Sequence, residues 1–134
     1  MNGPDFLRII SEAFWPFLKA LGFNMEPPSI SGRFYRANFN GQKNVVSISY
    51  EPGDNAQFIM IFNRENGELS DIDDRSKTPR LSDLNTRYMS LITPAERAKA
   101  EATFGAVQAV DEDEAFLLKS AKELSLVLPK YLNM

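Results

Sequence analysis

The sequence lacks both cysteine and histidine. Their absence excludes disulfides, thiolate or imidazole metal sites, and the common nucleophile–base pairs that contain either residue. No uncharged run approaches the ~20 residues that a membrane helix needs. The first apolar stretch is interrupted by Arg8 and Glu12, unlike the core of a signal peptide. These features predict a cytoplasmic protein with no cofactor and no membrane partner.

An excess of positive charge is also missing, since 15 Lys and Arg face 18 Asp and Glu and give a formal net charge of −3. Phosphate affinity comes mostly from Lys and Arg, so this composition speaks against nucleic acid as a partner. Hydrophobic residues make up 43% of the 134 residues and include 10 Phe, enough to fill a core. A chain of this length is expected to form one domain over residues 1–134.

A helix is predicted over residues 4–21, with one apolar face formed by Phe6, Ile10, Ala13, Phe17 and Leu21. Pro16 lies inside this helix and has no N–H to donate to the Glu12 carbonyl, so we expect a kink or a restart there. Trp15 falls on the side opposite Phe6, away from the apolar face.

The middle of the chain predicts an antiparallel meander of four strands, at residues 30–39, 43–51, 57–64 and 69–73. Asn40-Gly41 between the first two runs is a strong hairpin signal. The third run reads Phe58-Ile59-Met60-Ile61-Phe62 and is apolar on both faces. If helices cover only one side of the sheet, the other face exposes apolar side chains to solvent. Such a surface indicates a dimer or another partner.

The last part of the chain is helical in pattern. A short helix is predicted at residues 84–91, and Thr93-Pro94-Ala95-Glu96 combines a capping box with proline at the first helical position. On the helix that follows, one face is a smooth ridge that would allow close approach of another helix or the sheet; it is made of Ala95, Ala98, Ala102, Ala106 and Ala109. A final helix begins near Asp111 and is limited by Pro129. The order predicts an α+β fold of two layers, with an N-terminal helix, a four-stranded antiparallel meander and three helices packed on the sheet.

Two acidic clusters are candidate sites. Asp71, Asp73 and Asp74 offer the oxygen ligands that hard cations prefer, but the following Arg75, Lys77 and Arg80 favour a solvated strand exit with local ion pairs. A partner-binding acidic edge is the third interpretation. The second cluster is Asp111, Glu112, Asp113 and Glu114, which would attract a basic protein or stabilise the start of the last helix.

Aromatic and basic residues form the other candidates. Arg33-Phe34-Tyr35-Arg36 alternates on a strand, with either Tyr35 or Arg36 turned toward the core, and sheet packing is the favoured interpretation. The same mixture of aromatic residues and arginine is typical of protein–protein hot spots. Trp15 is the only tryptophan and is either an interface anchor or part of a core corner. The predicted partner-binding set is therefore Trp15, Arg33, Tyr35, Arg36 and the two acidic clusters.

One family resemblance bears on function. Phe14-Trp15-Pro16-Phe17-Leu18 and Leu21-Gly22-Phe23, followed by the Asn-Gly hairpin and a strand-rich middle, resemble the small α+β immunity proteins that bacteria make against their own polymorphic or contact-dependent toxins. The resemblance covers roughly the first 75 residues. It implies a cytosolic inhibitor that neutralises a cognate, often basic, toxin domain by direct binding, and it transfers no residue roles.

Two alternatives stay open. The chain is also similar to secretion chaperones in size, acidity, opening helix and sheet, which implies a chaperone or a homodimeric binding protein. The purely helical pattern of residues 82–133 speaks against the chaperone. A carboxylate- or metal-dependent enzyme using Tyr50, Tyr88 or Lys43 is the third candidate, and a selective stabilisation by one divalent ion would favour it.

Overall fold

The computed structural model describes residues 1–133. The chain begins with three consecutive helical segments: α1 (Gly3–Ile9), the π-helical turn η1 (Ile10–Phe14) and α2 (Trp15–Ala20). Six strands follow: β1 (Asn24–Met25), β2 (Ser29–Ile30), β3 (Tyr35–Asn40), β4 (Asn44–Glu51), β5 (Ala56–Glu65) and β6 (Glu68–Leu69). The rest is helical: α3 (Leu81–Tyr88), the 3₁₀ turn η2 (Met89–Leu91), α4 (Pro94–Phe104) and α5 (Glu112–Leu132).

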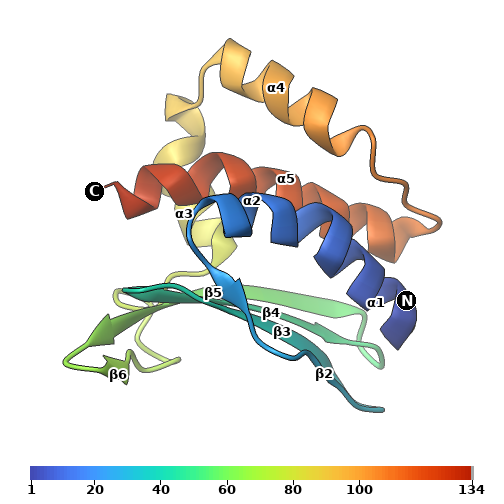
Figure 1. Cartoon of the computed structure of the whole chain (residues 1–134), viewed down its shortest axis with the longest axis horizontal. Helices are drawn as coiled ribbons and strands as arrows, with labels where there is room; N and C mark the ends of the chain where they lie inside the picture. The colour runs from blue at the N-terminus through green and yellow to red at the C-terminus, as the bar shows by residue number, and fades with distance from the viewer. Residues whose placement is uncertain (134) are drawn as a thin grey trace.

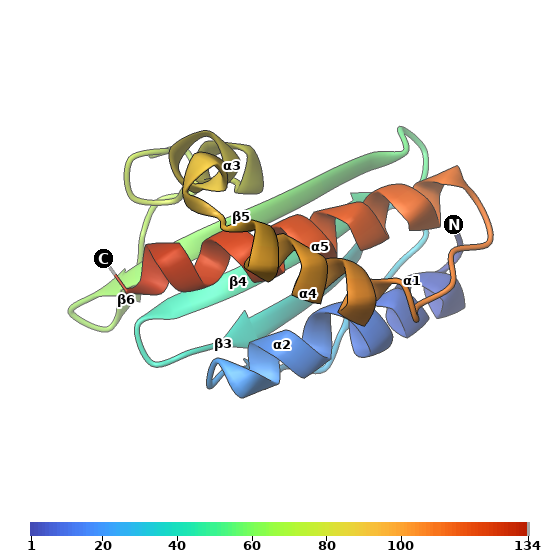
Figure 2. The same ribbon diagram turned by 90° about the horizontal axis from the view of Figure 1, so that it is seen from above.

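The strands form one antiparallel sheet in the order β1-β3-β4-β5-β6, with β2 also paired to β3. Among the described residues, the helices lie on one side of this sheet and leave its other face uncovered (Figure 1). Seen from above, α5 crosses the sheet next to the α1–α2 segment, and α4 lies over α5 (Figure 2). The predicted α+β class, with an N-terminal helix and helices packed against an antiparallel sheet, is confirmed.

The hydrophobic core fills the space between the sheet and the helices. Alternation turns Tyr35, Ala37 and Phe39 of β3 inward, where they meet the inward residues of β4 and β5. The helices contribute buried residues from α1, η1 and α5. The fully buried members include Phe6, Ile9, Ile10, Phe14, Ile48, Ile61, Leu117 and Leu124. Within residues 1–133, no helix combines the length and the apolar character that crossing a membrane requires.

Pro16 restarts the first helix instead of ending it. It lies in the first turn of α2, where an N–H is not needed, and the preceding π-helical turn widens the backbone at Ile10–Phe14. Trp15 packs against the core, with its ring stacked on Phe39 at 6.0 Å between centroids. The restart therefore places Trp15 against the sheet and not in the solvent.

The strand ends differ from the prediction. The strand predicted at residues 30–39 is divided, because the Ser31 hydroxyl accepts hydrogen bonds from the N–H groups of Arg33 and Phe34 and turns the chain between β2 and β3. The strand predicted at residues 69–73 ends at Leu69. Beyond it, Asp71 Oδ1 accepts from the Asp73 N–H at 2.9 Å, a turn that competes with strand pairing.

Two helical predictions were wrong. Pro129 does not limit the last helix: α5 continues to Leu132, since Tyr131 packs on Tyr88 and receives a hydrogen bond from Asn63. The alanine ridge does not form the packing face of α4 and is exposed along its length. The opposite face, with Ala100 and Phe104, is buried instead, and the Phe104 ring packs edge-on against Phe17.

Candidate functional site

On the uncovered face of the sheet, the type of side chain differs from one strand to the next. The pairing register places Arg36, Ser49 and Phe58 in one row across β3, β4 and β5. The next two rows have the same order: a polar residue on β3, a small residue on β4 and a large apolar residue on β5. These rows are Asn38, Ser47 and Met60, then Asn40, Val45 and Phe62.

Small residues on β4 leave a shallow groove along this face, which we name the outer groove. It encloses about 200 Å³ and is lined by Arg36, Asn38, Val45, Ser47, Met60, Phe62, Leu69 and Ile72. Ser47 and Val45 form its floor and are only 5% and 6% exposed, because longer side chains rise on both sides. On the β5 side the walls are apolar and open to solvent, since Leu69 is 47% and Ile72 45% exposed. Phe58, in the row of Arg36 on the same face, is 43% exposed.

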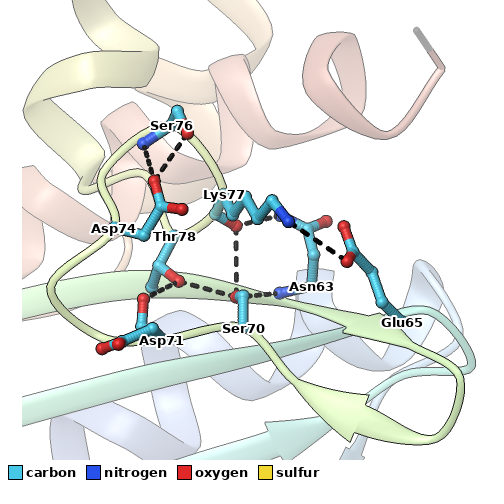
Figure 3. A network of polar contacts seen from close by, with 8 residues as sticks. All are labelled: Asn63, Glu65, Ser70, Asp71, Asp74, Ser76, Lys77 and Thr78. Atoms are coloured by element: carbon cyan, nitrogen blue, oxygen red, sulfur yellow. Dashed lines mark hydrogen bonds and ion pairs between the residues drawn. The ribbon is translucent and has the colours of Figure 1, made fainter.

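A polar network fixes the segment that supplies Ile72. Thr78 is fully buried, and its hydroxyl donates to the Asp71 carbonyl at 2.7 Å and contacts the Ser70 hydroxyl at 2.6 Å. The Ser70 hydroxyl in turn accepts from the Asn63 N–H of β5 at 3.0 Å (Figure 3). Lys77 pairs with Glu65 at 3.3 Å on the solvent side. The apolar wall at Leu69 and Ile72 is therefore tied to β5 at several points.

The first acidic cluster does not converge on a common point. Figure 3 shows the carboxylates of Asp71 and Asp74 directed away from one another. Asp74 accepts from the Ser76 hydroxyl at 2.6 Å, which holds the pKa of its carboxyl below the usual value. Asp71 and Asp73 are exposed beside Ile72 at the border of the outer groove. Within residues 1–133, no group of three or more acidic side chains is arranged to hold a metal ion.

The second acidic cluster is mostly built into the start of α5. Asp111 caps the helix, accepting from the Glu114 N–H at 2.9 Å. Asp113 accepts a hydrogen bond from the Tyr50 hydroxyl at 3.2 Å, and Glu114 is fully buried in an ion pair with Arg8. Asp111 and Glu112 are exposed, and neither forms an ion pair with another described residue. The cluster as a whole is therefore not a free acidic surface.

The predicted aromatic and basic residues are divided between the two sides of the sheet. Tyr35 faces the core, 5.6 Å from Phe6 and 5.8 Å from Tyr50 between ring centroids. Arg36 faces outward, lies over the Phe34 ring at 4.9 Å and lines the outer groove, while Arg33 is exposed in the turn before β3. Of the predicted set, Arg36, Asp71 and Asp73 thus lie at the outer groove or its border, whereas Trp15 and Tyr35 pack inward.

Sequence reasoning named none of the apolar walls of the outer groove as site residues. The signal was present in the run from Phe58 to Phe62, which is apolar on both faces, but the covered face could not be assigned from the run itself. Leu69 and Ile72 carried no pattern of their own, since their position depends on the turn that follows β6.

A larger cleft of about 430 Å³ lies between the α1–α2 segment, α4 and α5, with Phe17, Phe104 and Leu126 among its lining residues. Its two carboxylates already have partners. Glu12 pairs with Arg8 at 3.0 Å, and Glu96 pairs with Lys130 at 3.4 Å. The Thr93 N–H also donates to Glu96 and holds the pKa of its carboxyl below the usual value. These carboxylates serve helix capping and packing.

Comparison with known proteins found no matching family model, no matching curated sequence and no matching solved structure. The functional assignment therefore depends on the geometry of the chain itself.

Proposed function

We propose that the chain is a protein-binding module of the immunity or inhibitor type, which neutralises a cognate toxin domain by covering it directly, and that the outer groove is its docking surface. The observation that carries this proposal is the uncovered apolar wall of the sheet. Phe58, Leu69 and Ile72 are each more than 40% exposed; Leu69 and Ile72 line the groove, and Phe58 lies on the same face in the row of Arg36. Large apolar side chains gathered on one face of a monomer are typical of an interaction surface.

The charges around the outer groove indicate which charges the surface of the partner would carry. Asp71 and Asp73 flank Ile72 and are exposed, so a basic surface would be attracted to that end. Arg33 and Arg36 lie toward the β3 side and would pair with acidic residues at the other end of the partner's surface. A basic domain that presents an apolar ridge with an acidic end complements this arrangement.

The test is affinity capture with the tagged chain in extract of its source cells, read by mass spectrometry, with the Leu69→Lys/Ile72→Lys variant in parallel. We expect the native chain to retain one stoichiometric protein and the variant to lose it. Both positions are exposed, so the variant keeps its fold. Leu91→Lys is the matched control, because Leu91 is 60% exposed and lies on the helical side.

Three outcomes would contradict the proposal. Equal retention by the native chain and the groove variant would place the partner elsewhere. A solitary monomer in the capture experiment would remove the partner altogether. A dimer of the chain itself, dissociated by Leu69→Lys/Ile72→Lys in sizing experiments, would make a second copy the occupant and favour the homodimeric alternative.

A further inference from the structure

One stretch of the β5 edge has no neighbouring strand within residues 1–133. In β5 the N–H of Ile61 donates to the Pro79 carbonyl, and the carbonyl of Asn63 accepts from the Ser70 N–H. Both contacts point away from β4. Because the direction of backbone groups alternates along a strand, the N–H of Ile59 and the N–H and carbonyl of Gln57 also point away from β4. β6 pairs only with Arg64 and Glu65, and the bridge from Arg80 to Met60 marks the point where the covered part begins.

A cleft of about 340 Å³ follows this open edge. It is lined by Gln57, Phe58 and Ile59 of β5, by Leu81, Ser82 and Asn85 of α3 with Arg80 before it, and by Phe116, Ser120 and Glu123 of α5. The cleft is thus closed on one side by a strand edge and on the others by two helices. Phe58 and Phe116 are 43% and 56% exposed and supply its apolar rim.

Two side-chain acceptors in this cleft have no partner. The Oε1 of Gln57 and the Oδ1 of Asn85 are buried and receive no hydrogen bond from any described residue. The Nε2 of the same Gln57 is used, since it donates to the Asp113 carbonyl at 3.2 Å. A buried acceptor without a donor destabilises the chain, so two of them in one cleft favour a ligand that brings N–H groups.

We propose that the open edge of β5 binds an extended peptide segment of a partner protein, which adds a strand to the sheet beside Gln57–Ile59 and donates hydrogen bonds to the buried amides of Gln57 and Asn85. A strand supplies alternating N–H and carbonyl groups at the spacing of the free backbone groups of β5. An apolar side chain of the peptide packs between Phe58 and Phe116. One arginine and one glutamate line the cleft, so its own charge is balanced and a peptide without strong net charge fits it.

This inference concerns a surface different from the outer groove and does not depend on the proposed inhibitor function. Only Phe58 is near both surfaces. The variants below therefore avoid Phe58 and avoid the groove residues Leu69 and Ile72, so that failure of one proposal is distinguishable from failure of the other.

The free edge is tested first by amide hydrogen exchange on the full chain. Phe58 and Met60 turn their N–H groups toward β4, whereas Gln57 and Ile59 turn theirs outward. We expect the Gln57 and Ile59 amides to exchange at least about tenfold faster than those of Phe58 and Met60. Equal protection of all four amides would mean that the edge is already covered and would overturn the proposal.

Binding is tested with a decapeptide library displayed on phage and selected on the full chain. The best peptide is then synthesised in two series, each carrying single N-methyl groups at alternate amides. We expect methylation in one series to raise the dissociation constant about tenfold or more, because those amides face β5. Methylation in the other series should have little effect, since only alternate amides face β5. Peptide binding should also slow exchange at Gln57 and Ile59.

Two variants separate binding from folding. Asn85→Leu removes a buried acceptor that has no partner among the described residues. We therefore expect it to raise the melting temperature of the chain while weakening its affinity for the peptide. Phe116→Ser removes the exposed rim and should lower the affinity for the peptide without lowering the stability of the chain. Leu91→Ser, at another exposed apolar residue, should change neither the affinity nor the stability. The proposal is overturned if selection yields no binder, if N-methylation shows no alternation, or if peptide affinity is unchanged in both Asn85→Leu and Phe116→Ser.

Discussion

Tyr50 is the largest side chain among those that are fully buried, and its hydroxyl sits between two acceptors. It donates to Asp113 Oδ2 at 3.2 Å and lies 2.9 Å from Asn55 Oδ1. Burial, with the negative charge of Asp113 next in weight, raises the pKa of the phenol from 10.0 to about 12. Tyr50, one of the residues that an enzyme would have used, is therefore held neutral and joins β4 to the start of α5.

This pKa predicts a loss of stability at alkaline pH. The folded pKa is above the unfolded one, so the contribution of Tyr50 is complete below pH 10 and is lost as the pH rises toward 12. A difference of 2 pKa units corresponds to roughly 2–3 kcal/mol in the free energy of unfolding. We expect Tyr50→Phe to lose about 1 kcal/mol at pH 7 but to show a flatter decline above pH 10 in urea unfolding. Parallel pH profiles for the native chain and the variant would contradict this assignment.

The ion pair between Arg8 and Glu114 is the other buried polar contact at this end of the molecule. Glu114 is completely buried, whereas the side chain of Arg8 is 32% exposed and also donates to the Gln108 carbonyl at 3.1 Å. Removal of Arg8 would leave a carboxylate in the interior without its counter-charge.

We therefore expect Arg8→Met to destabilise the chain by about 2–4 kcal/mol. The double variant Arg8→Met/Glu114→Leu should recover much of this loss, because it leaves no buried charge behind. Chemical unfolding of both variants and of Glu114→Leu alone completes the cycle. Equal destabilisation in Arg8→Met and in the double variant would show that the charge of Glu114 is not the source of the cost.

At the scale of elements, the ends of the helices follow local rules. The Thr93 capping box begins α4 as the sequence predicts, and Asp111 caps α5. Pro16 lies in the first turn of α2, where a missing N–H costs little, whereas Pro129 lies inside α5 and removes one helical hydrogen bond near its end. The starts of α4 and α5 are therefore readable from the sequence, whereas the end of α5 and the buried face of α4 are not.

The acidic run at α5 supplies a matched pair of variants. Asp111→Ala removes the side chain that accepts from the Glu114 N–H, and we expect it to lower the free energy of unfolding by about 1 kcal/mol. Glu112→Ala removes an exposed charge that has no ion pair with a described residue and should change stability by less than about 0.5 kcal/mol. Thermal and urea unfolding measure both. A larger loss in Glu112→Ala than in Asp111→Ala would contradict the capping role.

At the scale of the whole molecule, the helices determine which side of the sheet is available for binding. α1, η1, α2 and α5 cover the inner face, and α3 packs beside α5 and β5. The outer face and one stretch of the β5 edge stay open. The open face is lined by apolar residues and two arginines from different strands, Arg36 and Arg64, although the chain carries a net negative charge.

The divergent carboxylates also lead to a prediction about divalent ions. Ligands that bind only the folded state raise the melting temperature. Asp71 and Asp74 point apart, so we expect Mg²⁺, Mn²⁺ and Ca²⁺ at millimolar concentration to produce no selective shift in thermal unfolding. A stabilisation specific to one ion, lost in Asp71→Asn/Asp73→Asn, would contradict this expectation and return the metal-dependent enzyme to first place.

The sequence by itself determined the elements whose signals are local. The Asn40-Gly41 hairpin, the restart at Pro16 and the caps at Thr93 and Asp111 all depend on residues within a few positions of each other. The apolar face predicted for the first helix holds only as far as Ala13, because the π-helical turn shifts the register, buries Phe14 and Leu18 and leaves Leu21 37% exposed. The same local signals predicted the α+β order of elements. They also identified the run from Phe58 to Phe62 as a strand with more apolar surface than one core can bury.

Only the tertiary structure decided which of those surfaces stayed open. The burial of Glu114 depends on Arg8, more than a hundred positions away, and the exposure of Phe58 depends on where α3 and α5 lie. The alanine ridge and Phe104 were equally plausible packing faces until α5 and Phe17 were placed beside one of them. Periodicity within a segment shows that a face exists, and contacts between distant segments decide what covers it.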